Sequence, residues 1–302
     1  MASEYTSQGD SVALTRQYFD SLLIEQRLMD SELADTTTEM FGHEFSTPIM
    51  TTALSHLGPS EHTLPNGLCE YAKGAAVANT LHWVGMCENP EFEQIFSMGA
   101  KTVRIIKPYA DEDKIFSQIE LCKKLGTVAC GIDIDHSFTR EGGYDICVGE
   151  QLNQKSSAKI REYIEFAKMP YIIKGVLSVH DAAAAANVGA AGIVVSHHNS
   201  RMNYVVPPLM ILEDIKKEVG DSLKIFVDCG IVSGMDAYKA LALGADAVCV
   251  GKALMPEIKA GGYEAVAAKI EQMTRELKGV MSFTGVTDMS KFDPTVIVRK
   301  LW

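Results

Sequence analysis

The chain has 302 residues, 47% of them hydrophobic, and a formal net charge of −11. That length allows one domain with a large core, and the acidic balance argues against nonspecific binding to nucleic acid or to anionic lipid headgroups. Seven scattered cysteines, the lack of a signal-peptide core and the lack of an apolar run of ~18 residues predict a cytoplasmic protein with free thiols and no membrane span.

The first 47 residues are expected to form a helical lead-in. Within it, the stretch Q-Y-F-D-S-L-L-I-E-Q-R-L-M (17–29) is expected to pack beneath or beside the domain that follows. Residues 48–302 show no domain boundary, short repeat or low-complexity tract, so they are expected to form a single domain.

Short apolar runs rich in Val and Ile alternate with amphipathic segments through that domain, which is typical of buried strands between surface helices. Strands are predicted near residues 48–53, 80–85, 102–107, 127–133, 170–175, 191–196, 224–229 and 247–251. Helices are predicted at 91–99, 111–126, 156–168, 179–189, 207–220 and 233–244.

Eight strands that alternate with helices predict an α/β protein with the (β/α)8 TIM-barrel fold. An open, doubly wound sheet is the alternative, but no G-x-G-x-x-G follows the first strand. The longest loop after a strand, residues 136–156, is rich in Gly and polar residues, and loops of this kind often carry function.

The last four predicted strands end in residues that can do chemistry or approach a phosphate. These residues are Lys174, His198 with Arg201, Asp228 with Gly230, and Gly251 with Lys252. Because the carboxyl ends of parallel strands meet at one face of a barrel, these residues predict an active site there.

His198 is the candidate general base, because a neutral imidazole can take a proton near neutral pH. A solvent-facing loop histidine is the alternative. Asp133, at the end of the fourth strand, could orient that imidazole, although Asp135 competes for this role. Arg201 could bind a carboxylate in bidentate fashion, with Arg140 as a second anchor, unless the two serve as loop ion pairs.

Lys174 ends an otherwise apolar strand, where a lysine needs a partner. It could stabilise an electron-rich cofactor, form a Schiff base or make a structural ion pair. The glycines that end the last two strands, Gly230 and Gly251, allow backbone N–H groups to approach a phosphate. Either could be an ordinary turn residue, but their occurrence at consecutive strand ends favours phosphate binding.

Two strings in this region carry a family resemblance. They are V-G-A-A-G-I-V-V-S-H-H-N-S-R and F-V-D-C-G-I-V-S-G-M-D-A-Y-K-A-L-A-L-G-A-D-A-V-C-V-G-K-A-L. The chain resembles the FMN-dependent 2-hydroxy-acid oxidases and dehydrogenases, the glycolate oxidase and lactate oxidase family. The resemblance is specific over about residues 170–255 and fainter over 41–50 and 129–135, so that it covers most of the chain.

The resemblance implies noncovalently bound FMN and a small organic acid as substrate. His198 would be the catalytic base, with Asp133 as its carboxylate partner. The substrate side of the site would consist of Arg201, Arg140 and Lys107. The cofactor contacts would be Ala53, Leu54, Ser55, Lys174, Ser196, Asp228, Gly230, Gly251 and Lys252.

Several positions depart from the family pattern. The asparagine expected before the histidine is His197, the following glycine is Asn199, and the arginine expected two residues after Gly230 is Val232. The tyrosine of the third strand is Lys107, and the threonine of the fourth strand is Gly131.

The expected reaction is the oxidation of a 2-hydroxy acid by proton removal and transfer of a hydride equivalent to flavin N5. Lys107 and His136 near the mouth suggest a substrate more polar or more anionic than lactate. The alternatives are an FMN-dependent isomerase or reductase, a Schiff-base aldolase that uses Lys174, and a barrel that binds a ligand without turnover. No metal, nucleic-acid partner or membrane span is expected, and homo-oligomerisation is left open.

Overall fold

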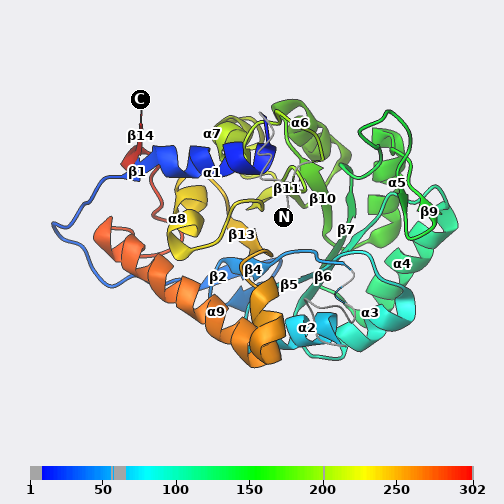
Figure 1. The fold of residues 1–302 in the computed structure, drawn as a ribbon, viewed down its shortest axis with the longest axis horizontal. Helices are drawn as coiled ribbons and strands as arrows, with labels where there is room; N and C mark the ends of the chain where they lie inside the picture. The colour runs from blue at the N-terminus through cyan, green and yellow to red at the C-terminus, as the bar shows by residue number, and fades with distance from the viewer. Residues whose placement is uncertain (1–8, 56, 58–65, 200, 301–302) are drawn as a thin grey trace, which may run out of the picture.

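The computed structural model describes residues 9–55, 57, 66–199 and 201–300, in which eight parallel strands form one sheet (Figure 1). The strands are β4 (Ile49–Thr51), β5 (His82–Val84), β6 (Thr102–Ile106), β7 (Ala129–Asp133), β10 (Tyr171–Val176), β11 (Gly192–Val195), β12 (Lys224–Val227) and β13 (Ala247–Val250). Their order around the sheet is β4-β13-β12-β11-β10-β7-β6-β5. The two edge strands meet through a bridge between Leu54 and Val84 and a 2.9 Å bond from the Gly85 amide to the Leu54 carbonyl oxygen. The predicted barrel is therefore confirmed.

Helices surround this barrel. They are α2 (Gly67–Val77), α3 (Asn89–Phe96), α4 (Glu112–Leu125), α5 (Ser157–Ala167), α6 (Val179–Val188), α7 (Pro208–Val219), α8 (Gly234–Ala242) and α9 (Met255–Phe283). All six predicted helical segments are confirmed. No described helix has both the length and the apolar character that crossing a bilayer requires.

Two helices, α2 and α9, were not predicted, and the sequence gives a physical reason for each. The Gly- and Ala-rich stretch of α2 has few large apolar residues to mark a buried face. In α9, Gly261 and Gly262 leave helical geometry and interrupt the pattern. The two helices pack closely at Gly74 of α2, where an added Cβ atom would lie only 2.6 Å from Val266 of α9.

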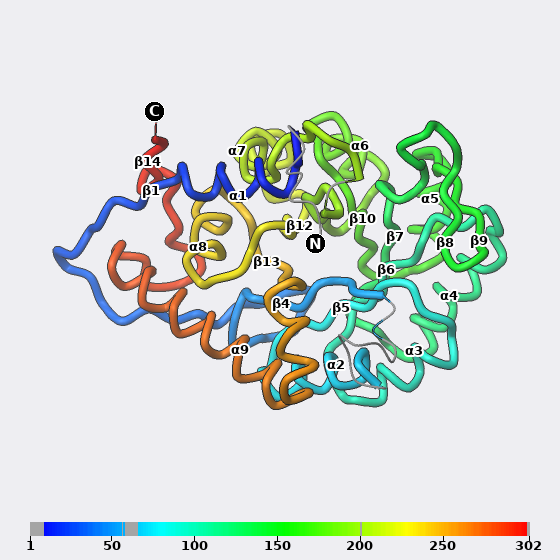
Figure 2. The backbone as a smooth tube through the Cα atoms, in the orientation of Figure 1, coloured from blue at the N-terminus to red at the C-terminus, as the bar shows by residue number. Residues whose placement is uncertain are grey.

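Within the described part of the expected helical lead-in (residues 9–47), only α1 (Ser11–Ser21) is helical; residues 1–8 lie outside the described range. The next segment, β1 (Leu22–Ile24), pairs antiparallel with β14 (Ile297–Arg299), which follows the short helix η1 (Pro294–Val296). The pairing places the segment that follows α1 beside the last strand of the chain (Figure 2). A local helical pattern cannot reveal a partner that lies so far along the sequence.

A hairpin of β2 (Thr38–Met40) and β3 (His43–Phe45) completes the lead-in. Its buried side chains, Met40 and Phe45, join the core inside the barrel, where Trp83 and Phe226 meet edge to face with their ring centroids 4.8 Å apart. A second, larger core lies between the barrel and its helices. The polar residues described below lie at the other end of the barrel, where the strands have their carboxyl ends.

Candidate active site

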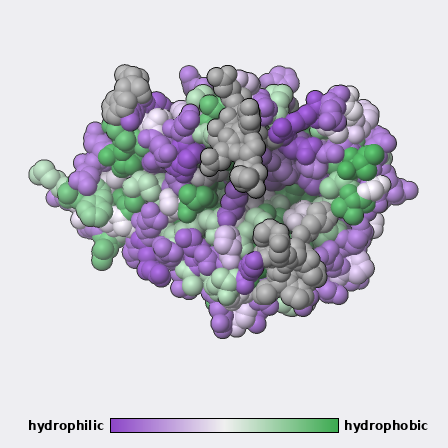
Figure 3. All heavy atoms as spheres, in the orientation of Figure 1, coloured by the Kyte–Doolittle hydropathy of each residue, from purple (hydrophilic) through white to green (hydrophobic). Residues whose placement is uncertain are grey.

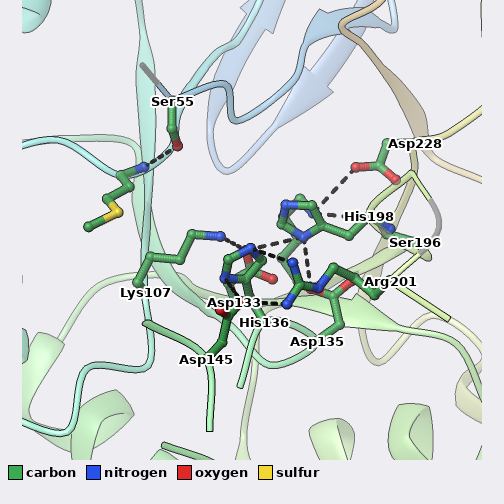
Figure 4. Close-up of polar contacts among 12 residues, drawn as sticks. Ser55, Lys107, Asp133, Asp135, His136, Asp145, Ser196, His198, Arg201 and Asp228 are labelled. Carbon is green, nitrogen blue, oxygen red and sulfur yellow. Dashed lines mark hydrogen bonds and ion pairs between the residues drawn. The ribbon is translucent and has the colours of Figure 1, made fainter. Parts of the chain in front are cut away.

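Charged and polar side chains gather at the carboxyl ends of the central strands (Figure 4). Lys107 follows β6, Asp133 ends β7, and Ser196 and Asp228 directly follow β11 and β12. These residues lie far apart in the sequence, and parallel barrel topology brings their strand ends to one face. The predicted gathering of reactive residues at this face is present in the structure.

His198 lies in the loop after β11 with a positive φ of 51°. Its backbone amide donates to Ser196 Oγ at 3.0 Å, which fixes the turn. Its Nδ1 lies 2.8 Å from Asp135 Oδ1 and 3.5 Å from Asp133 Oδ2. The nearer carboxylate is thus Asp135, whereas the family pattern assigns this place to Asp133.

The pKa of His198 reflects opposing influences. Burial and the positive charge of Lys174 lower it, but the carboxylates of Asp133 and Asp135 outweigh them and raise the pKa above its usual value. Burial also raises the pKa of Asp135, and the neighbouring charge of Asp133 adds to that shift. The imidazole and its nearer carboxylate therefore form a closely coupled pair.

Asp133 is already engaged by a different cation. The ammonium of Lys107 lies 2.6 Å from Asp133 Oδ2, and both side chains are buried. Burial alone would raise the pKa of Asp133, but Lys107, Lys174 and His198 hold it well below the usual range. Lys107, predicted to face the substrate, thus has a buried carboxylate partner.

Lys174 is buried, with its Nζ atom 3.5 Å from both Asp228 Oδ2 and Ser196 Oγ. Burial lowers the pKa of Lys174, but the surrounding carboxylates, Asp228 first, raise it above the usual lysine value. A Schiff-base lysine needs the opposite shift, because only the neutral amine attacks a carbonyl. The environment of Lys174 therefore gives no support to the aldolase alternative.

Both predicted substrate arginines lie at the mouth, within the loops that follow β7 and β11. Arg201 forms an ion pair with Asp145 and donates to the Phe138 carbonyl oxygen at 3.0 Å. Its Nη1 also lies 3.1 Å from His136 Nε2. Arg140 Nε donates to the Arg201 carbonyl oxygen at 3.1 Å. The Nε atom of Arg201 is buried and has no hydrogen-bond partner among the described residues.

The loop of residues 136–156 folds back on itself as β8 (Ile146–Cys147) and β9 (Glu150–Gln151). It supplies His136 and Asp145 to the group around Arg201. Burial, followed by the charges of Lys107 and Arg201, lowers the pKa of His136 to about 3, so this histidine is neutral at physiological pH. Neither His136 nor Asp145 can be recognised as a partner of Arg201 from the sequence, because only the loop fold brings them together.

A cavity of about 310 Å³ opens beside this group, at the ends of β12, β13 and β4. Five predicted cofactor residues line it: Leu54, Asp228, Gly230, Gly251 and Lys252. A Cβ atom on Gly251 would lie 2.5 Å from Thr52 Cγ2, so a larger residue would crowd this wall. Ala53 instead packs against the core inside the barrel. Ser55, which accepts a 2.7 Å bond from the Met86 amide, stands apart from His198 in Figure 4.

The cavity has one wall that the sequence analysis did not predict. Val12, Thr15 and Arg16 of α1 line it, and Thr15 Oγ1 lies 2.8 Å from His197 Nε2. The helix itself could be predicted from its local pattern, but its position over the strand ends depends on these contacts with distant residues.

Comparisons with known proteins agree with this geometry. The sequence profile of the FMN-dependent dehydrogenase family matches residues 2–159 and 142–299. A glycolate oxidase from Zea mays is 27% identical, over 99% of this chain and 92% of that relative. A 2-hydroxyacid oxidase from Dictyostelium discoideum is 24% identical, over 98% of this chain and 86% of that relative.

Among solved structures, a mandelate oxidase variant with a monooxide FMN adduct superposes with a TM-score of 0.87. The match covers 98% of this chain and 93% of that one, at 24% sequence identity. At that identity the likeness concerns the fold, and it agrees with the barrel.

Proposed function

The chain belongs to the family of FMN-dependent dehydrogenases, and from this premise we propose that it uses FMN to oxidise a 2-hydroxy acid to the corresponding 2-oxo acid. Relatives named glycolate oxidase and 2-hydroxyacid oxidase support this class of substrate. The observation that carries the proposal is the placement of the His198–Asp135 pair at the mouth of the barrel, beside a cavity lined by glycine and lysine.

The residues around the cavity fit FMN. Gly230 and Gly251 leave room for a phosphate to approach the backbone, and Lys252 would offset its charge. Asp228 would accept hydrogen bonds from the ribityl chain. The buried ammonium of Lys174, which the surrounding carboxylates keep protonated, would supply a fixed positive charge beside the isoalloxazine ring of FMN. When bound there, FMN supplies the acceptor for the two electrons that leave the substrate.

His198 would take the substrate proton on Nε2, because its Nδ1 is engaged by carboxylates. Asp135 would hold the imidazole in the tautomer with the proton on Nδ1 and would stabilise the imidazolium once it forms. Asp133 would add a second, more distant negative charge. We therefore place Asp135 in the orienting role and leave Asp133 as the buried partner of Lys107.

Arg201 would bind the substrate carboxylate. Its buried, unpartnered Nε–H is a donor that a bound carboxylate could satisfy, and leaving such a group unpaired costs about 1–3 kcal/mol. Asp145 and the Phe138 carbonyl hold the other end of the guanidinium, so its orientation is set before substrate arrives. Arg140, which contacts the backbone of Arg201, would be a second anchor.

The expectation of a more anionic substrate rested on positive charges at Lys107 and His136, and neither side chain supplies a free positive charge. Asp133 neutralises Lys107, and His136 is neutral because its pKa is lowered to about 3. We therefore propose a substrate with one carboxylate, such as a short or aromatic 2-hydroxy acid. The cytoplasmic location and any homo-oligomeric state stay predictions from the sequence.

The test is anaerobic addition of a panel of monocarboxylic 2-hydroxy acids to the FMN-loaded protein. We expect at least one of them to bleach the visible absorption of the flavin, and we expect the matching 2-oxo acid as product. Loaded protein whose flavin spectrum stays unchanged with every acid would contradict the proposal and would favour the isomerase alternative.

A further inference from the structure

Helix α1 lies across the cofactor end of the barrel mouth (Figure 1). Ser11 Oγ donates to the Met202 carbonyl oxygen at 2.8 Å, and Thr15 Oγ1 lies 2.8 Å from His197 Nε2. The face viewed in Figure 3 is mostly hydrophilic, with apolar atoms visible in a central hollow. Phe19 is fully buried beside Gly230, where a Cβ atom would lie 2.8 Å from its ring. These contacts make α1 a fixed wall of the cavity.

Arg16 is the charged residue on that wall. Its guanidinium grips Asp236 in bidentate fashion, at 3.1 Å and 2.9 Å, and Nη1 lies 3.3 Å from the Gly230 carbonyl oxygen. The side chain of Asp236 is only 4% exposed, so this ion pair holds the guanidinium in a fixed position at the cavity wall. Asp20, the other carboxylate on Arg16, is 67% exposed, and an exposed pair of that kind is readily exchanged.

Position 232 lies beside Arg16. The Val232 amide donates at 3.1 Å to Oδ2 of Asp236, the same carboxylate that Arg16 grips, and Val232 also lines the cavity. The family pattern has an arginine at this position, and the valine here removes that positive charge. Arg16, which belongs to α1, places a guanidinium next to position 232 in the same cavity wall.

The cavity lining carries two cationic side chains and one carboxylate. The cations are Arg16 and Lys252, and the carboxylate is Asp228. Asp228 is already paired with Lys174 at 3.5 Å and accepts from the Cys229 thiol at 2.9 Å. Within the described residues, Lys252 has no ion-pair partner. Two cations, Arg16 and Lys252, therefore line the cavity, and Arg16 is also paired with Asp236 and Asp20.

We propose that Arg16 binds the phosphate group of FMN from α1, opposite Lys252, and so replaces the arginine that the barrel lacks at position 232. This inference rests on the proposed function. It makes the N-terminal helix part of the cofactor site, in addition to its role as a structural lead-in.

The test compares binding of FMN with binding of riboflavin, which has the same ring and ribityl chain but no phosphate. Fluorescence quenching gives the Kd of each ligand for the wild type, for Arg16→Gln and for Arg27→Gln. Arg27 is a matched control, because it also bridges two carboxylates but lies away from the cavity. We expect Arg16→Gln to weaken FMN binding about 10- to 100-fold, the size of a lost charged hydrogen bond, and to leave riboflavin binding unchanged.

Loss of Arg16 also leaves Asp236 buried without its cation, so the double variant Arg16→Gln/Asp236→Asn guards against a simple folding defect. It should show the same selective loss of FMN affinity, and Arg16→Lys should recover part of it. Equal losses for FMN and riboflavin, or no loss for either, would overturn this inference alone. A wild type that binds neither ligand would overturn the proposed function together with the inference.

Discussion

The two halves of the barrel mouth differ in how their chemistry is built. On the cofactor half, at β12, β13 and β4, the glycines Gly230 and Gly251 line the cavity together with Lys252, which has no ion-pair partner among the described residues. On the substrate half, at β6, β7 and β11, nearly every charged side chain is paired with another, as in Lys107–Asp133, His198–Asp135 and Arg201–Asp145. A glycine at a strand end can be located from the local sequence. An ion pair between residues from different strands or loops can be located only once the fold is known.

This contrast predicts that the halves can be disabled separately, and His198→Ala should show it most strongly. Loss of the base should lower the rate of flavin reduction by 2-hydroxy acid about 10²- to 10⁴-fold, with the Kd for FMN unchanged. Stopped-flow absorbance measures the first quantity and fluorescence quenching the second. The control is His180→Ala, a 90% exposed position on α6, which should change neither. A variant that loses FMN affinity in parallel with its rate would show that the halves are not independent.

The buried pair on the substrate half should matter most for stability. Asp133→Asn leaves the ammonium of Lys107 buried without its counter-charge, so the free energy of unfolding should fall by about 3–5 kcal/mol. Urea denaturation measures this loss. The double variant Asp133→Asn/Lys107→Met should recover much of it.

The matched surface pair is Asp221 with Lys216, in which Asp221 is 98% exposed. Asp221→Asn should cost less than about 1 kcal/mol, because an exposed pair is screened by water. Equal losses for Asp133→Asn and Asp221→Asn would mean that the Lys107–Asp133 pair is not buried as described.

On the cofactor half, Gly230→Ala tests the backbone directly. Gly230 has a φ of 88°, and a Cβ there would lie 2.8 Å from Phe19 and Thr15, so the change should push α1 away from the cavity. We expect a loss of about 1–3 kcal/mol in stability together with weaker FMN binding. The control, Gly189→Ala, has the same φ of 88° but meets nothing within 4 Å, so it should destabilise the protein without affecting FMN. Identical FMN affinities for the two variants would show that Gly230 does not shape the cavity.

The smallest effect should appear in the pH profile. Because Asp133 and Asp135 raise the pKa of His198, the neutral base is lost as pH falls, and kcat/KM should rise with pH through a midpoint above about 6.5. Asp135→Asn should move that midpoint down by removing one of the raising charges.

The same shift has a consequence for stability. A raised histidine pKa stabilises the fold below the unfolded value of about 6.5, and this contribution fades as pH rises through the folded pKa. The contribution of His198 to stability and its contribution to activity should therefore respond to pH in opposite directions in the wild type. A profile for kcat/KM that is unaltered by Asp135→Asn would return the orienting role to Asp133.

The barrel could be predicted from the sequence, because each strand is a short apolar run and the residues that follow the run mark the carboxyl end of the strand. The same logic located Gly230, Gly251 and Lys252 at the cavity. It could not predict that Lys107 pairs with Asp133, because β6 and β7 must first be aligned side by side. Nor could it predict the pairing of β1 with β14 or the place of α1 over the mouth, since both depend on residues distant in the chain.

The account depends most on one property, the capacity of the cofactor half to bind FMN whether or not the substrate half can act. Titration of the apoprotein with FMN, followed by quenching of flavin fluorescence, measures it in the wild type and in His198→Ala. The account predicts saturable binding of one FMN per chain with the same Kd in both proteins. A folded wild type that leaves flavin fluorescence unquenched at excess FMN would contradict it.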